Sequence, residues 1–162
     1  MIVVSDTTAL STLYLINRME WLGSLFGQVL IPEAVYAELL ELEAAGHDLQ
    51  VIRTADWLRV LPVKNLQLVS ELQQGLDVGE SEAIVLALET QADYLLIDER
   101  KGSRQADALG IPTIGLLRVI LELKARKIIA QVKPVLDEIK MAGGFWLSDR
   151  LYARVLEAAG EA

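Results

Sequence analysis

Apolar residues along the chain form short continuous runs, which alternate with longer segments where they recur every three or four positions. Short runs rich in β-branched residues predict buried strands, and the longer periodic segments predict helices. The predicted strands cover residues 1–5, 28–31, 57–63, 94–97 and 112–115. Because these strands are apolar throughout, they favour a parallel sheet with helices on both faces, an α/β layered fold.

Helical periodicity fills most of the chain between and after these strands. The predicted helices cover residues 8–18, 19–26, 32–45, 66–74, 80–91, 100–109, 116–127, 133–142 and 148–159. Thr7 or Thr8 is the expected N-cap of the first helix, since a hydroxyl side chain there satisfies a free amide. No element is predicted over residues 46–56, and this segment is expected to be the most mobile loop.

The composition is typical of one folded domain. The chain has 162 residues, 52% of them hydrophobic, and no run reaches the ~18 apolar residues that span a bilayer. The absence of cysteine excludes disulfides, thiolate metal sites and a cysteine nucleophile, and His47, the one histidine, cannot build a multi-histidine zinc site. No basic stretch precedes the apolar start, so we expect no signal peptide and a cytoplasmic location.

The formal net charge of −8 constrains the partners. An acidic chain gains no general attraction to phosphates, so nucleic-acid binding requires a local cluster of basic residues. The other possibility is that some of the carboxylates surround a divalent cation such as Mg²⁺.

Two aspartates follow directly on predicted strands. Asp6 comes after MIVVS, and Asp98 comes after YLLI. The carboxyl ends of parallel strands meet at one edge of a sheet, where ligands bind, so both side chains are expected there. For Asp6 alone, an equally good interpretation is that it caps the next helix.

Two glutamates occupy apolar positions of predicted helices. Glu38 shares the stripe of Val35 and Leu42, and Glu80 is in register with the apolar face of its helix. A carboxylate on a buried face is costly unless it is paired or coordinated. For Glu80 the alternative is an acid favoured by the helix dipole in the first turn.

The four carboxylates have no cationic partner nearby in the sequence, so they would repel one another or require a cation. A ligand set made of oxygens alone selects Mg²⁺ or Mn²⁺ rather than zinc. Such acidic clusters suit phosphodiester hydrolysis, in which a bound metal lowers the pKa of a water molecule.

At these residues the sequence resembles the PIN-domain family. The segments VVSDTTAL, PEAVYAELL and GESEAIVLALETQADYLLIDER resemble its motifs, in order, over roughly residues 1–125. The resemblance implies a three-layer α/β/α sandwich with a Rossmann-like parallel sheet of about four to five strands. It predicts a single PIN-like domain over residues 1–162, with about 128–162 as a helical C-terminal extension.

The resemblance also implies an activity and a site. It implies a Mg²⁺- or Mn²⁺-dependent ribonuclease, of the kind found as VapC-type toxins that pair with an antitoxin protein and form homodimers. The metal-binding and catalytic acids would be Asp6, Glu38, Glu80 and Asp98. Thr8 would orient the first carboxylate, with Thr7 able to serve in part.

The sequence departs from the family pattern at three points. Leu96 stands where many members have threonine, the third acid is Glu80 rather than aspartate, and Glu82 is close enough to compete for its role. These departures, with the ending LLIDER, suggest a less-characterised branch. They also leave open a PIN-like module that binds RNA or protein with little or no nuclease activity.

A basic cluster follows the last acid. Arg100, Lys101 and Arg104 begin the helix after Asp98 and are predicted to bind RNA phosphates, although a solvated helix start would look the same. A phosphoryl-transfer domain of receiver type would also place acids at strand ends. It would need a lysine at a late strand end, where this sequence has Leu116.

Overall fold

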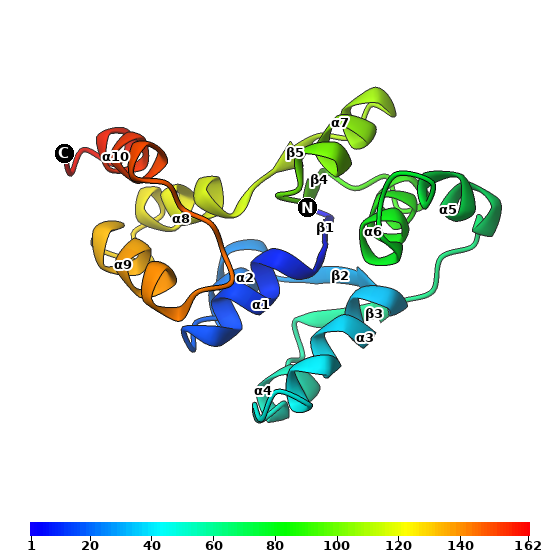
Figure 1. Ribbon diagram of the computed structural model, residues 1–162, viewed down its shortest axis with the longest axis horizontal. Coiled ribbons are helices and arrows are strands. Elements are labelled where there is room, and N and C mark those ends of the chain that lie inside the picture. The colour runs from blue at the N-terminus through cyan, green and yellow to red at the C-terminus, as the bar shows by residue number, and fades with distance from the viewer.

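The computed structural model describes residues 1–162 and contains a five-stranded parallel sheet in the order β3-β2-β1-β4-β5. The sheet runs through the middle of the molecule, with helices on both of its faces (Figure 1). This confirms the predicted α/β sandwich. The strands are β1 Val3–Ser5, β2 Val29–Pro32, β3 Leu58–Leu61, β4 Tyr94–Leu96 and β5 Thr113–Ile114.

The register of the central strands sets the position of the acids. In β1, Val3 lies opposite Val29 of β2 and Tyr94 of β4, and Ser5 lies opposite Leu96. The amide of Asp6 then donates to the carbonyl of Leu96 at 2.9 Å. Strands β1 and β4 therefore end side by side, and the residues that follow them emerge at the same edge.

Ten α-helices and one 3₁₀ turn surround the sheet. Their bounds are α1 Thr7–Leu15, α2 Glu20–Phe26, α3 Glu33–Leu40, η1 Glu41–Glu43, α4 Gln50–Arg53, α5 Leu66–Leu72, α6 Val78–Glu89, α7 Arg100–Ala108, α8 Leu116–Ala125, α9 Lys133–Ala142 and α10 Asp149–Ala158. No helix is both long and apolar enough to cross a membrane.

The two faces of the sheet bury separate apolar clusters. Val29, Ile31 and Leu96 belong to the larger one, which also includes residues of α1, α2, α3, α8, α9 and α10. Alternate strand residues such as Leu30 and Leu95 belong to the smaller one, with residues of α6 and α7. Side chains of a strand point alternately to its two sides, so apolar runs place both layers.

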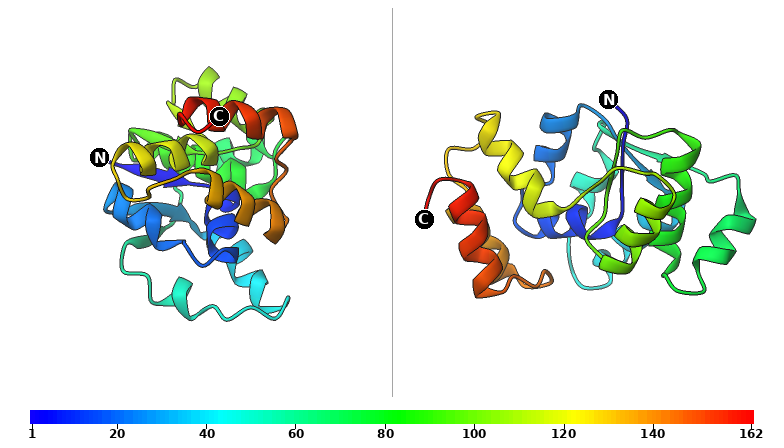
Figure 2. Two further views of the ribbon diagram at one scale, coloured as in Figure 1. Left: turned by 90° about the vertical axis from the view of Figure 1, so that its left-hand side faces the viewer. Right: turned by 90° about the horizontal axis from the view of Figure 1, so that it is seen from above.

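The C-terminal helices pack against the rest of the domain. Val132, Leu136 and Ile139 share the larger core with Leu10 and Leu13 of α1. In Figures 1 and 2 the helices α8, α9 and α10 lie together at one side of the molecule. Residues 128–162 therefore contribute buried surface to the same core as the sheet.

Three local predictions are wrong. The N-cap of α1 is Asp6 rather than Thr7 or Thr8. The segment 46–56 contains the short helix α4, because Leu49 and Ile52 are buried in the core. The predicted helix 32–45 is shorter: α3 ends at Leu40 and gives way to the 3₁₀ turn.

Candidate active site

Asp6 is the most deeply buried acid of the sheet edge. Its side chain is the N-cap of α1 and accepts a hydrogen bond from the Thr8 amide at 3.2 Å. Burial, followed by the charge of Asp98, raises the pKa of Asp6 well above its usual range. The Asp6 carboxylate thus caps the helix and also lies near other acids, and its role as a metal ligand stays a prediction.

Asp98 follows β4 and lies beside the start of α8. Its Oδ1 accepts a hydrogen bond from the Leu116 amide at 3.0 Å, whereas its Oδ2 is buried without any hydrogen-bond partner. Burial raises the pKa of Asp98. A buried carboxylate oxygen without a partner is costly, and a bound cation or donor would remove that cost.

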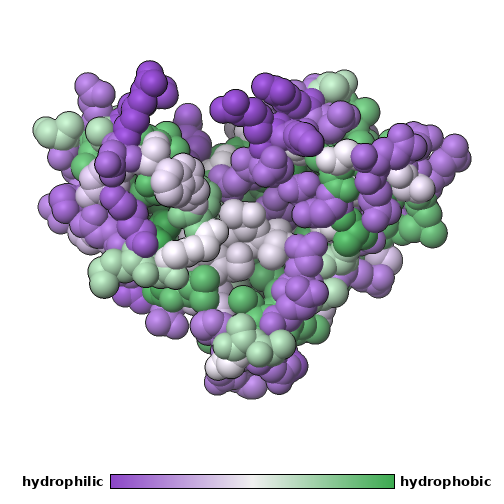
Figure 3. All heavy atoms as spheres, viewed as in Figure 1, coloured by the Kyte–Doolittle hydropathy of each residue, from purple (hydrophilic) through white to green (hydrophobic).

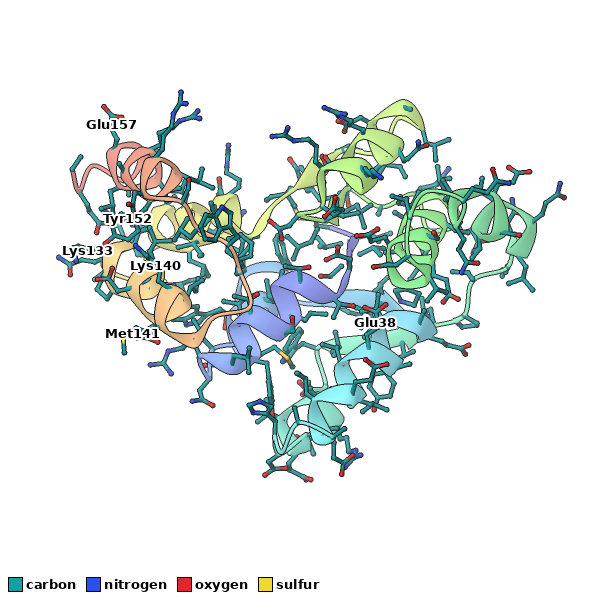
Figure 4. All side chains as sticks on the ribbon, in the orientation of Figure 1. Glu38, Lys133, Lys140, Met141, Tyr152 and Glu157 are labelled. Atoms are coloured by element: carbon teal, nitrogen blue, oxygen red, sulfur yellow. The ribbon has the colours of Figure 1, made fainter.

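Glu38 reaches the site from α3 and is half-buried. Figure 4 marks it near the middle of the molecule, below α6. Its carboxylate accepts a hydrogen bond from the Thr7 hydroxyl. Burial raises the pKa of Glu38, and the Thr7 hydroxyl and the Gly79 amide lower it in part. The Glu38 side chain is thus tied to the starts of both α1 and α6.

Glu80 stands in the first turn of α6 and forms a capping box with Asp77. Asp77 Oδ1 accepts from the Glu80 amide at 2.8 Å, and Glu80 Oε2 accepts from the Asp77 amide at 3.4 Å. Burial, followed by the charge of Asp77, raises the pKa of Glu80. The helix-start interpretation of Glu80 is therefore correct, and it does not remove the residue from the acidic edge.

Asp77 is a further carboxylate at this edge, in addition to the four predicted acids. Its charge contributes to the raised pKa of Asp6, Glu38 and Glu80, so it lies near all three. The signal that could have found it is the segment DVGE, because an N-cap acid followed three residues later by glutamate marks a capping box.

Of the supporting residues, Thr8 contacts Asp6 as predicted, whereas Thr7 and Glu82 make other contacts. Thr8 holds Asp6 through its backbone amide, and the Thr7 hydroxyl binds Glu38 instead of Asp6. Glu82 accepts a hydrogen bond from the Ala34 amide at 3.1 Å, in the first turn of α3. Glu82 therefore stabilises the start of the helix that carries Glu38, and its carboxylate is used there.

Two glycines allow the backbone to approach the site carboxylates. A Cβ atom on Gly79 would lie 2.9 Å from the Glu38 carboxyl carbon, and one on Gly115 would lie 3.0 Å from Asp98 Oδ1. Only glycine leaves room for these contacts. Glu38 can therefore pack against α6, and Asp98 against α8, because Gly79 and Gly115 have no side chain.

The chemistry of the cluster suits a hard divalent cation, although the side chains are not arranged as a finished metal site. The burial, the raised pKa values of all four predicted acids and the lone Oδ2 of Asp98 all favour a positive charge. With these side-chain conformations, however, no group of three or more acids or histidines could hold a metal ion. The four-carboxylate metal site stays a prediction.

Basic side chains do not neutralise the cluster. No lysine or arginine forms a salt bridge with Asp6, Glu38, Glu80 or Asp98. This also disfavours the receiver-type alternative, which requires a lysine at the site. Arg100, Lys101 and Arg104 are exposed on α7, the helix that begins two residues after Asp98, and none of them is in a salt bridge.

Comparison with known proteins identifies the family. Residues 2–161 match the family DUF3368, described as a PIN domain, so the chain belongs to the PIN-domain family and has a nuclease-like fold. A similar solved structure is a PilT N-terminus domain protein from the hyperthermophilic archaeon Sulfolobus solfataricus P2. The two sequences are 23% identical. The match covers 74% of this chain and 90% of the Sulfolobus chain, with a TM-score of 0.50. No curated protein matches the sequence.

The match supports the fold directly and the chemistry in general terms. PIN domains are generally nucleases that use divalent metal ions. At 23% identity the similarity to the Sulfolobus structure supports the fold alone. The family and its sandwich fold are therefore confirmed, and the particular reaction is taken up below as a proposal.

Proposed function

We propose that this protein is a ribonuclease that depends on Mg²⁺ or Mn²⁺ and hydrolyses RNA phosphodiester bonds. The observation that carries the proposal is a set of four partly or fully buried carboxyl groups at one sheet edge, each with a raised pKa and none with a basic partner. Such a set is unfavourable without a cation. The PIN-domain membership makes a nuclease the natural use of the cluster.

Asp6, Glu38, Glu80 and Asp98 would supply the oxygen ligands. A bound divalent ion would lower the pKa of a water molecule and stabilise charge on the phosphate. Asp6 and Asp98 are held by backbone amides at 3.2 and 3.0 Å, so each keeps one carboxylate oxygen free of these bonds. Glu38 and Glu80 are held by Thr7 and Asp77, which orient their side chains from the starts of α1 and α6.

The proposal includes the wider role implied by the family resemblance. The protein would be the toxin of a toxin–antitoxin pair, would act in the cytoplasm and would form homodimers. Trp146 and Met141, which are 85% and 89% exposed, offer apolar contacts of the kind that interfaces use. Size-exclusion chromatography with light scattering, at several concentrations, tests the dimer.

A second candidate is a PIN-like module that binds RNA or a protein without cleaving RNA. One observation favours it, namely that no three acidic side chains could hold a metal ion in their present conformations. The two candidates differ in one measurement, because a binding module retains RNA or partner binding but leaves RNA intact when Mn²⁺ is added.

Calorimetric titration with Mn²⁺ tests the metal site. The wild type should bind Mn²⁺, and a variant with Asp6→Asn and Asp98→Asn should not, because it loses two of the four proposed ligands. The exposed Asp56, outside the cluster, provides the matched control Asp56→Asn. Equal binding by the wild type and the double variant would disprove the site.

A further inference from the structure

A cleft of about 550 Å³ lies between the end of α5 and the outer side of α7. The α5 side contributes Gln74, Gly75 and Leu76, and the α7 side contributes Lys101, Arg104 and Gln105. Glu71 also borders the cleft. It is separate from the acidic cluster, since none of the four predicted acids lines it.

The cleft begins beside the acidic cluster on both of its walls. Leu76 directly precedes Asp77, the N-cap of the helix that carries Glu80. On the other wall, a Cβ atom placed on Gly102 would lie 4.0 Å from the Glu80 carboxyl carbon. Leu76 and Lys101 of the two walls are thus next in sequence to residues that lie at the acidic cluster, so the cleft adjoins the cluster.

The charges of the cleft are suited to phosphate. Lys101 and Arg104 are exposed, and no carboxylate lies within salt-bridge distance of either side chain. Hydrophilic residues cover the surface over α7 in Figure 3. The cleft thus carries two unpaired cations and one carboxylate, that of Glu71, in a chain whose net charge is −8. Cations with free donors are the usual partners of nucleic-acid phosphates.

The neutral groups of the cleft suit an unpaired base. The side-chain amides of Gln74 and Gln105 can each donate and accept hydrogen bonds, as the edges of bases require. A cleft of about 550 Å³ is of the size that holds a small ligand, such as a single nucleotide. Single-stranded RNA exposes its base edges for such contacts.

We propose that this cleft is a substrate subsite, which binds the nucleotide of a single-stranded RNA next to the phosphate held at the acidic cluster. Lys101 and Arg104 bind its phosphate, and Gln74 and Gln105 contact its base. The inference rests on the proposed ribonuclease function, and it extends that function by assigning a site for the nucleotide next to the cleaved bond. Arg100 does not line the cleft and contributes only general attraction.

The test measures binding in EDTA, so that cleavage plays no part. A fluorescent single-stranded RNA is titrated with full-length protein, and anisotropy is followed over a range of salt concentrations. Lys101→Gln and Arg104→Gln should each weaken binding roughly tenfold, which corresponds to one charge-assisted hydrogen bond. Each should also lower the slope of log affinity against log salt by about 0.7.

Arg154→Gln is the matched control, because Arg154 is exposed on α10 and makes no salt bridge. It should leave affinity and slope unchanged. Gln74→Ala and Gln105→Ala should leave the salt slope unchanged and alter the preference among RNAs of different sequence. Duplex RNA of the same length should compete poorly.

Two results would overturn the subsite. One is that Lys101→Gln and Arg104→Gln bind RNA as Arg154→Gln does; the other is that duplex RNA competes as well as the single strand. If Mn²⁺-dependent cleavage persists in those cases, only the subsite fails. If the cleft variants lose binding while the wild type never cleaves RNA, the subsite stands and the ribonuclease proposal fails.

Discussion

Replacing Asp98 with asparagine should change stability in opposite directions with and without metal. Asp98→Asn keeps the oxygen that accepts from the Leu116 amide, removes one negative charge from the cluster and gives the lone buried Oδ2 position to an amide donor. Without metal, the variant should therefore be more stable than the wild type by about 1–2 kcal/mol. This is the usual gain when a residue that destabilises a protein for the sake of its function is replaced. In a domain of 162 residues this raises the melting temperature by about 2–8 °C.

Mn²⁺ should reverse the order. A metal at about 100 times its dissociation constant stabilises the wild type by about 2.7 kcal/mol. That corresponds to a rise in melting temperature of about 5–11 °C. Asp98→Asn loses a ligand and should show little of this rise.

Thermal unfolding at pH 7, followed by circular dichroism in EDTA and in Mn²⁺, measures both effects. Asp56→Asn, an exposed aspartate with no part in the cluster, controls for the change of charge and residue type. The reasoning is wrong if Asp98→Asn melts below the wild type in EDTA, or if Mn²⁺ raises both melting temperatures equally.

Three further predictions concern the same structure. Gly79→Ala should displace Glu38, whose carboxyl carbon would lie 2.9 Å from the new Cβ, and cost about 1–3 kcal/mol in urea unfolding; Gly75→Ala, with open space around it, is the control and should cost less. The four site carboxyls have raised pKa values, so they bind protons more readily in the folded protein than in the unfolded protein. Without metal, their contribution to stability should be largest at acidic pH and should fall as pH rises through those pKa values. Glu161 should show the opposite pH dependence. Burial raises the pKa of Glu161, but hydrogen bonds from Lys124 and from the amides at the start of α9 outweigh it and lower the pKa to about 2. Its contribution to stability is therefore present above the unfolded pKa of about 4.5 and is lost as pH falls toward 2.

These predictions have separate controls and outcomes. Glu161→Gln should lower the urea midpoint at pH 7 and make little difference near pH 2, and an equal loss at both pH values would contradict the assignment. For the site carboxyls, Asp6→Asn should flatten the pH dependence of stability. A Gly79→Ala protein that equals Gly75→Ala in both stability and Mn²⁺ affinity would show that Glu38 does not need its contact with α6.

The sequence predicted the framework of the site because strand ends and helix faces obey short-range periodicity. The apolar runs before Asp6 and Asp98 located both acids at one sheet edge, and the helical stripe of α3 turned Glu38 inward. All three positions follow from patterns within a few residues, which propensity and periodicity describe.

The contacts that adjust the site involve residues far apart in the chain, and periodicity does not report them. Gly79 lies against Glu38, and Glu82 caps α3 at Ala34, so the roles of both depend on the packing of α6 on α3. The hydrogen bond from Thr7 to Glu38 could not be predicted for the same reason, because the two residues are 31 positions apart in the chain. The failure over residues 46–56 has a similar cause, since Leu49 and Ile52 are ordered by the core rather than by a long helical pattern.

The most direct test of the central claim is RNA cleavage in the presence of Mn²⁺. Purified wild-type protein is incubated with labelled single-stranded RNA in Mn²⁺ or in EDTA, beside Asp6→Asn and the control Asp56→Asn. A metal-dependent ribonuclease predicts cleavage by the wild type and by Asp56→Asn in Mn²⁺ alone, and none by Asp6→Asn. Cleavage that is the same with Asp6→Asn, or that persists in EDTA, would contradict it.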